Sequence, residues 1–434
     1  MFKSVANLFR IPEVRKRILY TVGFLVVYRV GWNIPLPGID PDKVKAVVNQ
    51  GGGQAGILQF LDIISGGGIQ HASLFSLGIM PYISASIIFS LLVKVIPALE
   101  KLSKEGSAGT RKINQWTRIA TVPICMVQGF FAIKPYMRPH AVLNGVPITF
   151  SPDPGFWWAT GSIVALIAGA IFLMWIGEQI TENGVGNGIS LLIMAGIVAR
   201  LPVSLVGANL TAAHAVLLSA LFVFVILGVV YITKGQRKIP VQYAKLTRGR
   251  RVYGGQRHYL PIRVNQAGVM PVIFASALLA FPQMIFSAIG LPRLANALHH
   301  GQYLWSLLYI VLTFFFAFFW VALMFNPLEM SKNMKEYGSF IPGIRPGKPT
   351  AEHLERIMNR ITLAGASFLA VIAVLPVIIA DTLNLPENLT YYLGGTTILI
   401  VVSVALDLVD KLNSYLVMRN YDGFLRGGGG KGGR

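Results

Sequence analysis

The sequence predicts an all-α polytopic membrane protein with ten transmembrane helices, arranged as two inverted halves of five helices each. Three observations lead to this fold class. Charged residues make up only 13% of the chain, which is about half the fraction usual in a soluble domain. Apolar stretches of about 20 residues, the length that crosses a bilayer, recur along the sequence. A short motif also occurs twice, once in each half of the chain.

Ten apolar stretches are bounded by charged residues or by proline and glycine clusters. If the N-terminus is cytoplasmic, roughly five times as many Lys and Arg residues fall on the cytoplasmic side as on the external side. A miscount of one span would destroy this alternation, so the charges favour ten spans with both termini in the cytoplasm. Much of the net charge of +20 is thereby attributed to topology. The predicted spans lie near 18–38, 74–96, 116–134, 157–176, 188–208, 214–233, 267–290, 304–328, 361–382 and 391–411.

The segment between the first two spans contains a short apolar piece, residues 57–64, with glycine clusters on both sides. This piece is too short to span the membrane. It is either a short amphipathic helix on the outer leaflet or a re-entrant segment packed inside the protein. Glycine-rich backbone is tolerated at membrane depth only where protein buries it or where it lines a cavity. The residues alone leave both interpretations open.

Two predicted cytoplasmic loops stand out for their length, residues 234–266 and 329–360. Loops this long are usually functional or disordered. We therefore divide the chain into an N-terminal half, residues 1–210, a C-terminal half, residues 211–412, and a flexible tail, residues 413–434.

The motif that occurs twice reads GIMPYISASII at residues 78–88 and GVMPVIFASAL at residues 268–278. Each copy opens the second span of a group of five. Because five is odd, the second half must enter the membrane inverted, as in transport proteins built from inverted repeats around a central pathway. Ile83 and Ile273 occupy the same position in the two copies. We expect the copies to face each other at an interface of small residues that can open.

Several other functions are disfavoured by what the spans contain. No Asp, Glu or His lies in the middle of a predicted span, which weakens the alternative of an ion-coupled transporter of small solutes. The His residues lack metalloprotease spacing, and the single Cys125 forms neither an intrachain disulfide nor a cysteine metal site. We therefore expect no enzyme activity, cofactor or metal.

The segment 184–188 superficially resembles a phosphate loop, but it follows an apolar helix and is interpreted as a tight turn. A membrane scaffold without a pathway remains a further alternative.

Several motifs, taken in their order and spacing, resemble the SecY family of bacterial protein-conducting channel subunits over nearly the whole chain. The matching strings are Ile34–Gly38, Leu77–Ser86, Gly177–Thr181, Gly186–Ser190, Lys234–Arg237, Ile344–Gly347 and Gly394–Thr396. The resemblance implies a clamshell of two halves, an hourglass pore, and a plug helix near residues 58–71. It also implies that unfolded secretory chains cross through the pore and that membrane segments leave sideways between the second and seventh helices. The re-entrant interpretation of the glycine-flanked segment is favoured accordingly.

The resemblance also implies four groups of functional residues. An apolar pore ring would retain ions while moulding around a passing chain, although ordinary core packing suits each isoleucine equally well. The ring would be formed by Ile79, Ile83, Ile189, Ile193, Ile273 and Ile400. The plug would include Phe60, Leu61, Ile63, Ile64, Ser65, Gly66 and Gly67. The lateral gate would include Ser84, Ser86, Phe274 and Ser276. The cytoplasmic loops would dock partners through Arg248, Arg250, Arg251 and Arg345.

The partners implied by the resemblance are the small membrane subunits SecE and SecG, the SecA ATPase and the ribosome. Signal peptides and unfolded preproteins would be the passengers, and membrane lipids would surround the spans. Clustered arginines suit phosphate-rich ribosomal RNA or an acidic protein groove, while a solvated basic loop that only satisfies topology is the simpler alternative. Because no nucleotide site is recognised in the chain, the energy for transport is expected from a partner. The expected location is the bacterial inner membrane.

Overall fold

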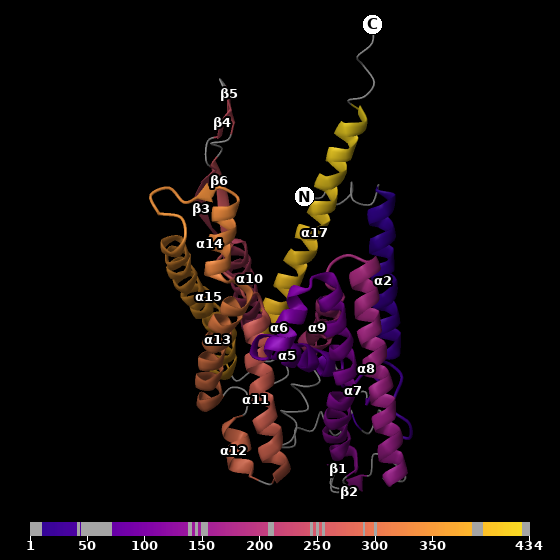
Figure 1. Ribbon diagram of the computed structural model, residues 1–434. Helices are drawn as coiled ribbons and strands as arrows, with labels where there is room; N and C mark the ends of the chain where they lie inside the picture. Colours follow the sequence, from indigo (N-terminus) through magenta and orange to yellow (C-terminus); the bar gives the residue numbers. More distant parts are fainter. Residues whose placement is uncertain are drawn as a thin grey trace. The chain divides into compact units, whose positions relative to one another are not determined.

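The computed structural model is predominantly helical (Figure 1). It divides into two compact units, Met1–Gly207 with Val404–Arg434, and Ala208–Ser403. The residues that the structure describes are 11–40, 44, 72–137, 141–143, 146–148, 155–206, 212–243, 246–248, 251–253, 257–289, 291–298, 302–383 and 394–427.

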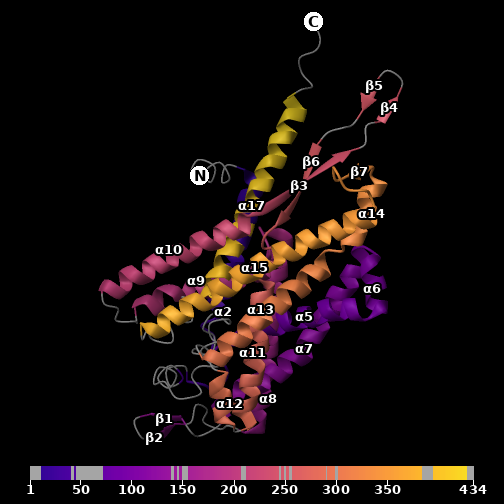
Figure 2. The ribbon, with the colours of Figure 1, turned by 90° about the vertical axis from the view of Figure 1, so that its left-hand side faces the viewer.

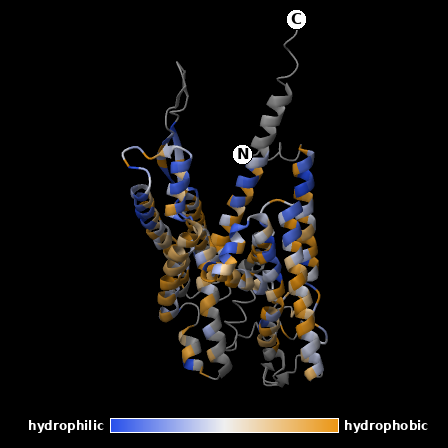
Figure 3. Cartoon of the chain, in the orientation of Figure 1, coloured by the Kyte–Doolittle hydropathy of each residue, from blue (hydrophilic) through white to orange (hydrophobic). Residues whose placement is uncertain are grey.

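Each of the ten predicted spans overlaps one helix. The first five are α2 (Pro12–Gly31), α5 (Met80–Val95), α7 (Ser107–Met137), α8 (Phe156–Asn183) and α9 (Gly188–Val206). The second five are α10 (Ala212–Lys234), α11 (Met270–Ile289), α13 (Tyr303–Met324), α15 (Lys348–Thr382) and α17 (Gly395–Gly427). Within the described part of the chain, five helices are long and apolar enough to cross a membrane by themselves, or six if α5 and the helix after it count as one bent span. Helices α2 and α17 are not among these five, because charged residues at the start of α2 and along α17 lower their apolar character (Figure 3).

Proline explains the bend after α5. Helix α6 (Pro97–Lys104) follows α5 after a single extended residue, Ile96, and the two helix axes differ by 99°. Pro97 cannot continue the preceding helix, because its ring disfavours the helical conformation of the residue before it and it has no backbone N–H. Helix α6 is polar, and Lys104 forms an ion pair with Glu100 at 2.9 Å. This hydrogen bond and the Lys104 charge lower the pKa of Glu100 from its ordinary value.

The helices of each group pack in the same order. In the first group the second helix, α5, packs on the third, α7, which packs on the fourth, α8, and α2 also packs on α8. In the second group α11 packs on α13, α13 packs on α15, and α10 also packs on α15. Figure 2 allows the helices of each group to be followed from a second direction. The helix order that the sequence repeat predicts is therefore present within both groups.

Two glycines mark a further equivalence between the groups. Gly188 begins α9, and a Cβ atom there would overlap the backbone carbonyl oxygen of Gly177 in α8. Gly395 begins α17, and a Cβ atom there would overlap the backbone carbonyl oxygen of Ile372 in α15. The fifth helix of each group thus starts in direct contact with the backbone of the fourth, an approach that only glycine permits.

The repeated motif has the same local structure in both copies. Gly78 and Gly268 have φ angles of +54° and +65°, a region that glycine adopts without steric cost. A helix begins two residues later in each copy, with proline as its second residue, where the missing N–H costs nothing. Ala85 and Ala275, which are equivalent in the repeat, are both completely buried. Sequence identity in the repeat therefore corresponds to the same local backbone conformation and to burial of the same alanine.

The two long loops form a small antiparallel sheet, in addition to the helices. Its strand order is β6 (Arg257–Arg263), β3 (Gln236–Tyr243), β7 (Ser339–Phe340), so β3 pairs with a strand from each loop. Tyr243 lies opposite Ser339 in the register of β3 and β7. Two hairpins pair β4 (Leu246–Arg248) with β5 (Arg251–Tyr253), and β1 (Ala141–Leu143) with β2 (Val146–Ile148). The remaining short helices are α12 (Pro292–Ala297) and α14 (Pro327–Glu336).

The sheet is held on α15 by an apolar cluster. Ile239 of β3, Ile262 of β6 and Ile341 after β7 are buried together with Leu354 and Met358 of α15. Burial of these branched side chains from β3, β6 and the residue after β7 against one helix stabilises the arrangement by about 1.5–3 kcal/mol per fully buried side chain. The two loops therefore form one packed unit with the start of α15.

Candidate functional site

Two of the predicted ring isoleucines lie one turn apart on α5. Ile79 is the N-cap residue, and its backbone carbonyl accepts a hydrogen bond from the Ile83 N–H at 3.0 Å. Residues four positions apart lie on one face of a helix, and both side chains are buried, with 6% and 9% exposure. In α11 the Ile273 N–H makes the equivalent hydrogen bond to the Val269 carbonyl at 3.2 Å. The repeat therefore places Ile83 and Ile273 at the same point of the first helical turn.

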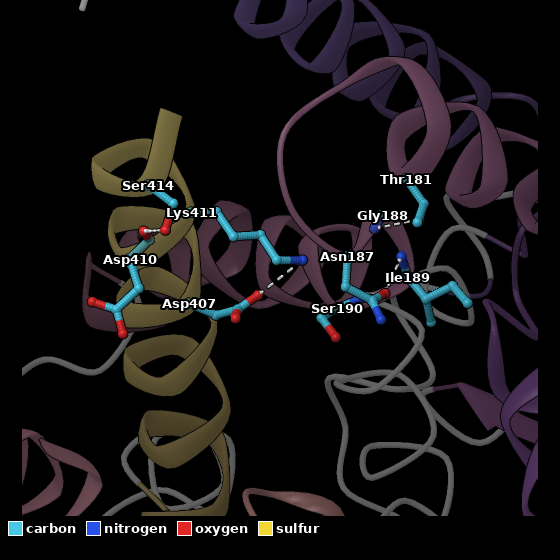
Figure 4. A network of polar contacts seen from close by, with 9 residues as sticks. All are labelled: Thr181, Asn187, Gly188, Ile189, Ser190, Asp407, Asp410, Lys411 and Ser414. Carbon is cyan, nitrogen blue, oxygen red and sulfur yellow. Dashed lines mark hydrogen bonds and ion pairs between the residues drawn. The ribbon is translucent and has the colours of Figure 1, made fainter. Parts of the chain in front are cut away.

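Ile189 and Ile193 lie one turn apart on α9 and are partly buried. The start of α9 is capped by Asn187, whose side-chain oxygen accepts hydrogen bonds from the N–H groups of Ile189 and Ser190 (Figure 4). The Thr181 hydroxyl accepts a further hydrogen bond from Gly188 N–H. The segment 184–188 is thus a tight turn with a capped helix start, as the sequence predicts.

The remaining ring residue, Ile400, is partly buried on α17. Ile273 and Ile400 belong to one compact unit, and the ring residues of α5 and α9 belong to the other. That the six isoleucines meet in one ring stays a prediction.

The turn between α8 and α9 is tied to two other helices of its own unit. The Arg17 guanidinium of α2 donates a hydrogen bond to the Gly184 carbonyl at 3.2 Å and lies over the Tyr415 ring of α17 at 5.4 Å. The Thr21 hydroxyl accepts a hydrogen bond from Val185 N–H. Further along α17, Lys411 and Asp407 form an ion pair (Figure 4). The start of α9, which carries two ring residues, is therefore braced by the first and last long helices.

The four predicted gate residues differ in their surroundings. Ser84 accepts a hydrogen bond from the Gln128 side chain of α7 at 3.3 Å, whereas the Ser276 hydroxyl donates to the carbonyl of Ile273 in its own helix. Ser86 is partly buried on α5. Phe274 is buried and makes edge-to-face contacts with two aromatic residues of α13. Core packing within its own unit accounts for Phe274, and a gating role for the four residues stays a prediction.

The predicted plug falls outside the described residues. This applies to Phe60, Leu61, Ile63, Ile64, Ser65, Gly66 and Gly67.

The docking arginines lie in the loops that build the sheet. Arg248 ends β4 and Arg251 begins β5, and the two positions are directly opposite each other in the hairpin. Arg250 lies outside the described residues. Arg345 is exposed in the turn between β7 and α15. The hairpin of β4 and β5 lies between β3 and β6 in the chain, and the Arg345 turn follows β7. Because β3 pairs with both β6 and β7, both arginine-bearing segments are connected to one sheet.

Some polar contacts were not anticipated from the sequence. Arg118 of α7 forms an ion pair with Glu178 of α8 at 2.6 Å. The signal for this pair was available, because both residues lie at the same end of adjacent, oppositely directed spans. Gln128, by contrast, sits in an apolar run with nothing nearby in sequence to indicate its partner. No group of three potential metal ligands occurs among the residues that the structure describes.

Comparison with known proteins gives consistent matches. A family model described as SecY matches residues 73–409. Protein translocase subunit SecY of Thermotoga maritima is 40% identical and covers 99% of both chains. The same subunit of Streptomyces coelicolor is 43% identical, over 98% of this chain and 100% of the relative.

Solved structures with the same architecture include one described as "The structure of a protein conducting channel", with a TM-score of 0.62 and 20% identity. A second is described as "Sec61 in the Canine ribosome-channel complex from the endoplasmic reticulum", with a TM-score of 0.59 and 20% identity. Each match covers 94% of this chain and 96% of the solved chain. These matches confirm the predicted fold class, a polytopic helical membrane protein.

Proposed function

Because the chain belongs to the SecY family, we propose that unfolded polypeptides cross the membrane between its two five-helix halves, and that membrane segments leave sideways into the bilayer. The chain is a translocase subunit and not an enzyme. The observation that carries the pathway proposal is the repeat, since the second helix of each half starts with the same motif and the same geometry. An inverted repeat places its pathway between its two copies.

The proposed constriction is a ring of the six isoleucines, with Ile83 and Ile273 as its repeat-related pair. An apolar constriction excludes ions because it offers no ligands in place of their water shell. Branched aliphatic side chains also have several rotamers, so such a ring can adapt to different passenger side chains. The absence of ionisable residues from the middle of the predicted spans supports a passive pathway over an ion-coupled carrier.

Substitution of Ile83 and Ile273 by Ser tests the ring. We expect the double variant to raise the ion conductance of planar bilayers that contain the purified channel complex. The matched control is Ile88→Ser, which changes an exposed isoleucine of the same helix α5. Unchanged conductance in the double variant, with a folded protein, would remove the ring assignment.

The proposed partners are the SecE and SecG subunits, the SecA ATPase and the ribosome, with signal peptides and preproteins as passengers. The described Sec61 structure is a ribosome-channel complex, and the basic loops of this chain suit RNA phosphates or an acidic protein surface. The similar subunits of Thermotoga maritima and Streptomyces coelicolor support a location in the bacterial inner membrane. The excess of basic residues in alternate loops supports an orientation with both termini in the cytoplasm.

Arg345→Glu tests docking. We expect it to lower SecA-driven export into membrane vesicles while the channel stays folded, because a carboxylate would repel the acidic surface that the guanidinium is proposed to contact. Export at the wild-type rate would contradict a docking role for this residue.

A further inference from the structure

The Arg345 turn, defined here as residues 341–347, joins β7 to α15. Its first residue, Ile341, is buried in the cluster that holds the sheet on α15. The Ile344 N–H donates to the Ile341 carbonyl at 3.1 Å, and the Ala351 N–H of α15 donates to the Gly347 carbonyl. Both ends of the turn are therefore attached to packed structure.

Two buried hydroxyl groups hold carbonyl groups of this turn. Ser331 of α14 is 3% exposed, and its hydroxyl donates a hydrogen bond to the Gly347 carbonyl at 2.6 Å. Thr350, in the first turn of α15, is 2% exposed, and its hydroxyl donates to the Arg345 carbonyl at 2.8 Å. The two donors belong to different helices and hold the carbonyls on either side of Pro346.

The backbone itself has little freedom at this point. Pro346 fixes its own φ angle and disfavours the helical region for Arg345. Gly347 has a φ angle of +105°, which a residue with a side chain rarely adopts. Meanwhile the Arg345 side chain is exposed, and within the described part of the chain its guanidinium has no hydrogen-bond or ion-pair partner. The turn thus presents one unpaired cation on a backbone that is held from two sides.

We propose that Ser331 and Thr350 are positioning residues that fix the Arg345 turn before a partner binds. A partner then does not bear the conformational entropy cost of ordering the loop, which otherwise subtracts from the affinity. This inference rests on the docking role proposed for Arg345. A basic loop that only satisfies membrane topology needs a positive charge but no fixed backbone, so the two hydroxyl contacts favour recognition of a rigid acidic surface.

The test uses the complete channel complex in proteoliposomes and measures the SecA concentration that gives half-maximal ATP-driven export. Ser331→Ala and Thr350→Val each remove one hydrogen bond, and we expect each to raise this concentration by about 2- to 12-fold. The export rate at saturating SecA should stay unchanged. Thr350→Ser keeps the hydroxyl and should retain wild-type affinity. Ser367→Ala, which removes a hydroxyl bonded within α15 itself, serves as the control and should behave like wild type.

A second comparison shows whether the hydroxyl groups act through Arg345. In an Arg345→Ala background, Thr350→Val should have no further effect on the half-maximal SecA concentration, whereas an additional and equal loss would contradict the inference. If Arg345→Ala alone changes nothing, the docking proposal fails. If Arg345→Ala weakens SecA binding but the hydroxyl variants do not, only the positioning role fails. If Ser331→Ala does not fold, the comparison of Thr350→Val with Thr350→Ser tests the positioning role.

Discussion

Substitution of Gly188 or Gly395 by Ala should destabilise the protein, because the fifth helix of each half starts against the backbone of the fourth. A Cβ atom at Gly188 would overlap the Gly177 carbonyl oxygen, and one at Gly395 would overlap the Ile372 carbonyl oxygen. Backbone atoms cannot rotate away as a flexible side chain can, so the helices must move apart. Insertion of an extra carbon into a packed core typically costs about 1–3 kcal/mol.

The single cysteine offers a direct assay of this loss. Cys125 is completely buried, so a thiol-reactive dye reports unfolding of the purified complex in detergent as the temperature rises. A loss of about 1–3 kcal/mol corresponds to a decrease in Tm of roughly 2–12 °C, using the relation for domains of about 150–250 residues. Gly161→Ala is the matched control, since a Cβ atom there has no neighbour within 4 Å. Equal Tm values for Gly188→Ala, Gly395→Ala and the control would refute the close approach of the helices.

Two further predictions concern other contacts of the structure. Arg17→Ala should lower the free energy of unfolding by about 1–2 kcal/mol, because it removes a hydrogen bond and the contact with the Tyr415 ring. Tyr415→Phe keeps an aromatic ring and should change the Tm little. An equal loss of stability in both variants would argue against the cation–π contact. Cysteines at Tyr243 and Ser339, which lie opposite each other in β3 and β7, should form a disulfide under mild oxidation. Cysteines at Tyr259 and Ser339 should not, since β3 lies between their strands, and equal crosslinking of both pairs would contradict the sheet.

Much of the helical fold was predictable because its signals are local in the sequence. The length of an apolar stretch and the charges beside it are set by the bilayer and the topology rule, and each of the ten predicted spans overlaps a helix. The repeat is also visible locally, because both copies keep the residue that the same backbone conformation favours. Gly78 and Gly268 stand at equivalent positions, and both have a positive φ angle.

The ends of several helices were not predictable from hydropathy. Helix α15 begins at Lys348 and α17 continues to Gly427, both well outside the predicted spans 361–382 and 391–411. The additional turns carry charged residues, which remain compatible with a helix in water but give no apolar signal. Apolar length therefore locates the membrane part of a helix and leaves its polar extension undetermined.

The sheet and its contacts were missed because their partners are distant in the sequence. The pairing of Tyr243 with Ser339 joins two loops that are separated by two spans. The hydroxyl groups of Ser331 and Thr350 bond to carbonyl groups that are nearer in the sequence, but these contacts depend on the conformation of the turn, which hydropathy does not report. Nothing local distinguishes these two residues from other hydroxyl residues of the chain. The ring and gate residues were predicted only through the repeat and the family resemblance, because no local pattern separates them from ordinary core residues.

The most direct test of the pathway is crosslinking of a secretory chain stalled during transport. Single cysteines would be placed at Ile79 and Ile83 in a Cys125→Ala background, with Ile119→Cys as the control, because Ile119 is 68% exposed on α7. A pathway between the two halves predicts that the stalled chain crosslinks to positions 79 and 83 and not to position 119. Absence of crosslinks at positions 79 and 83, or equal crosslinking at all three positions, would contradict it.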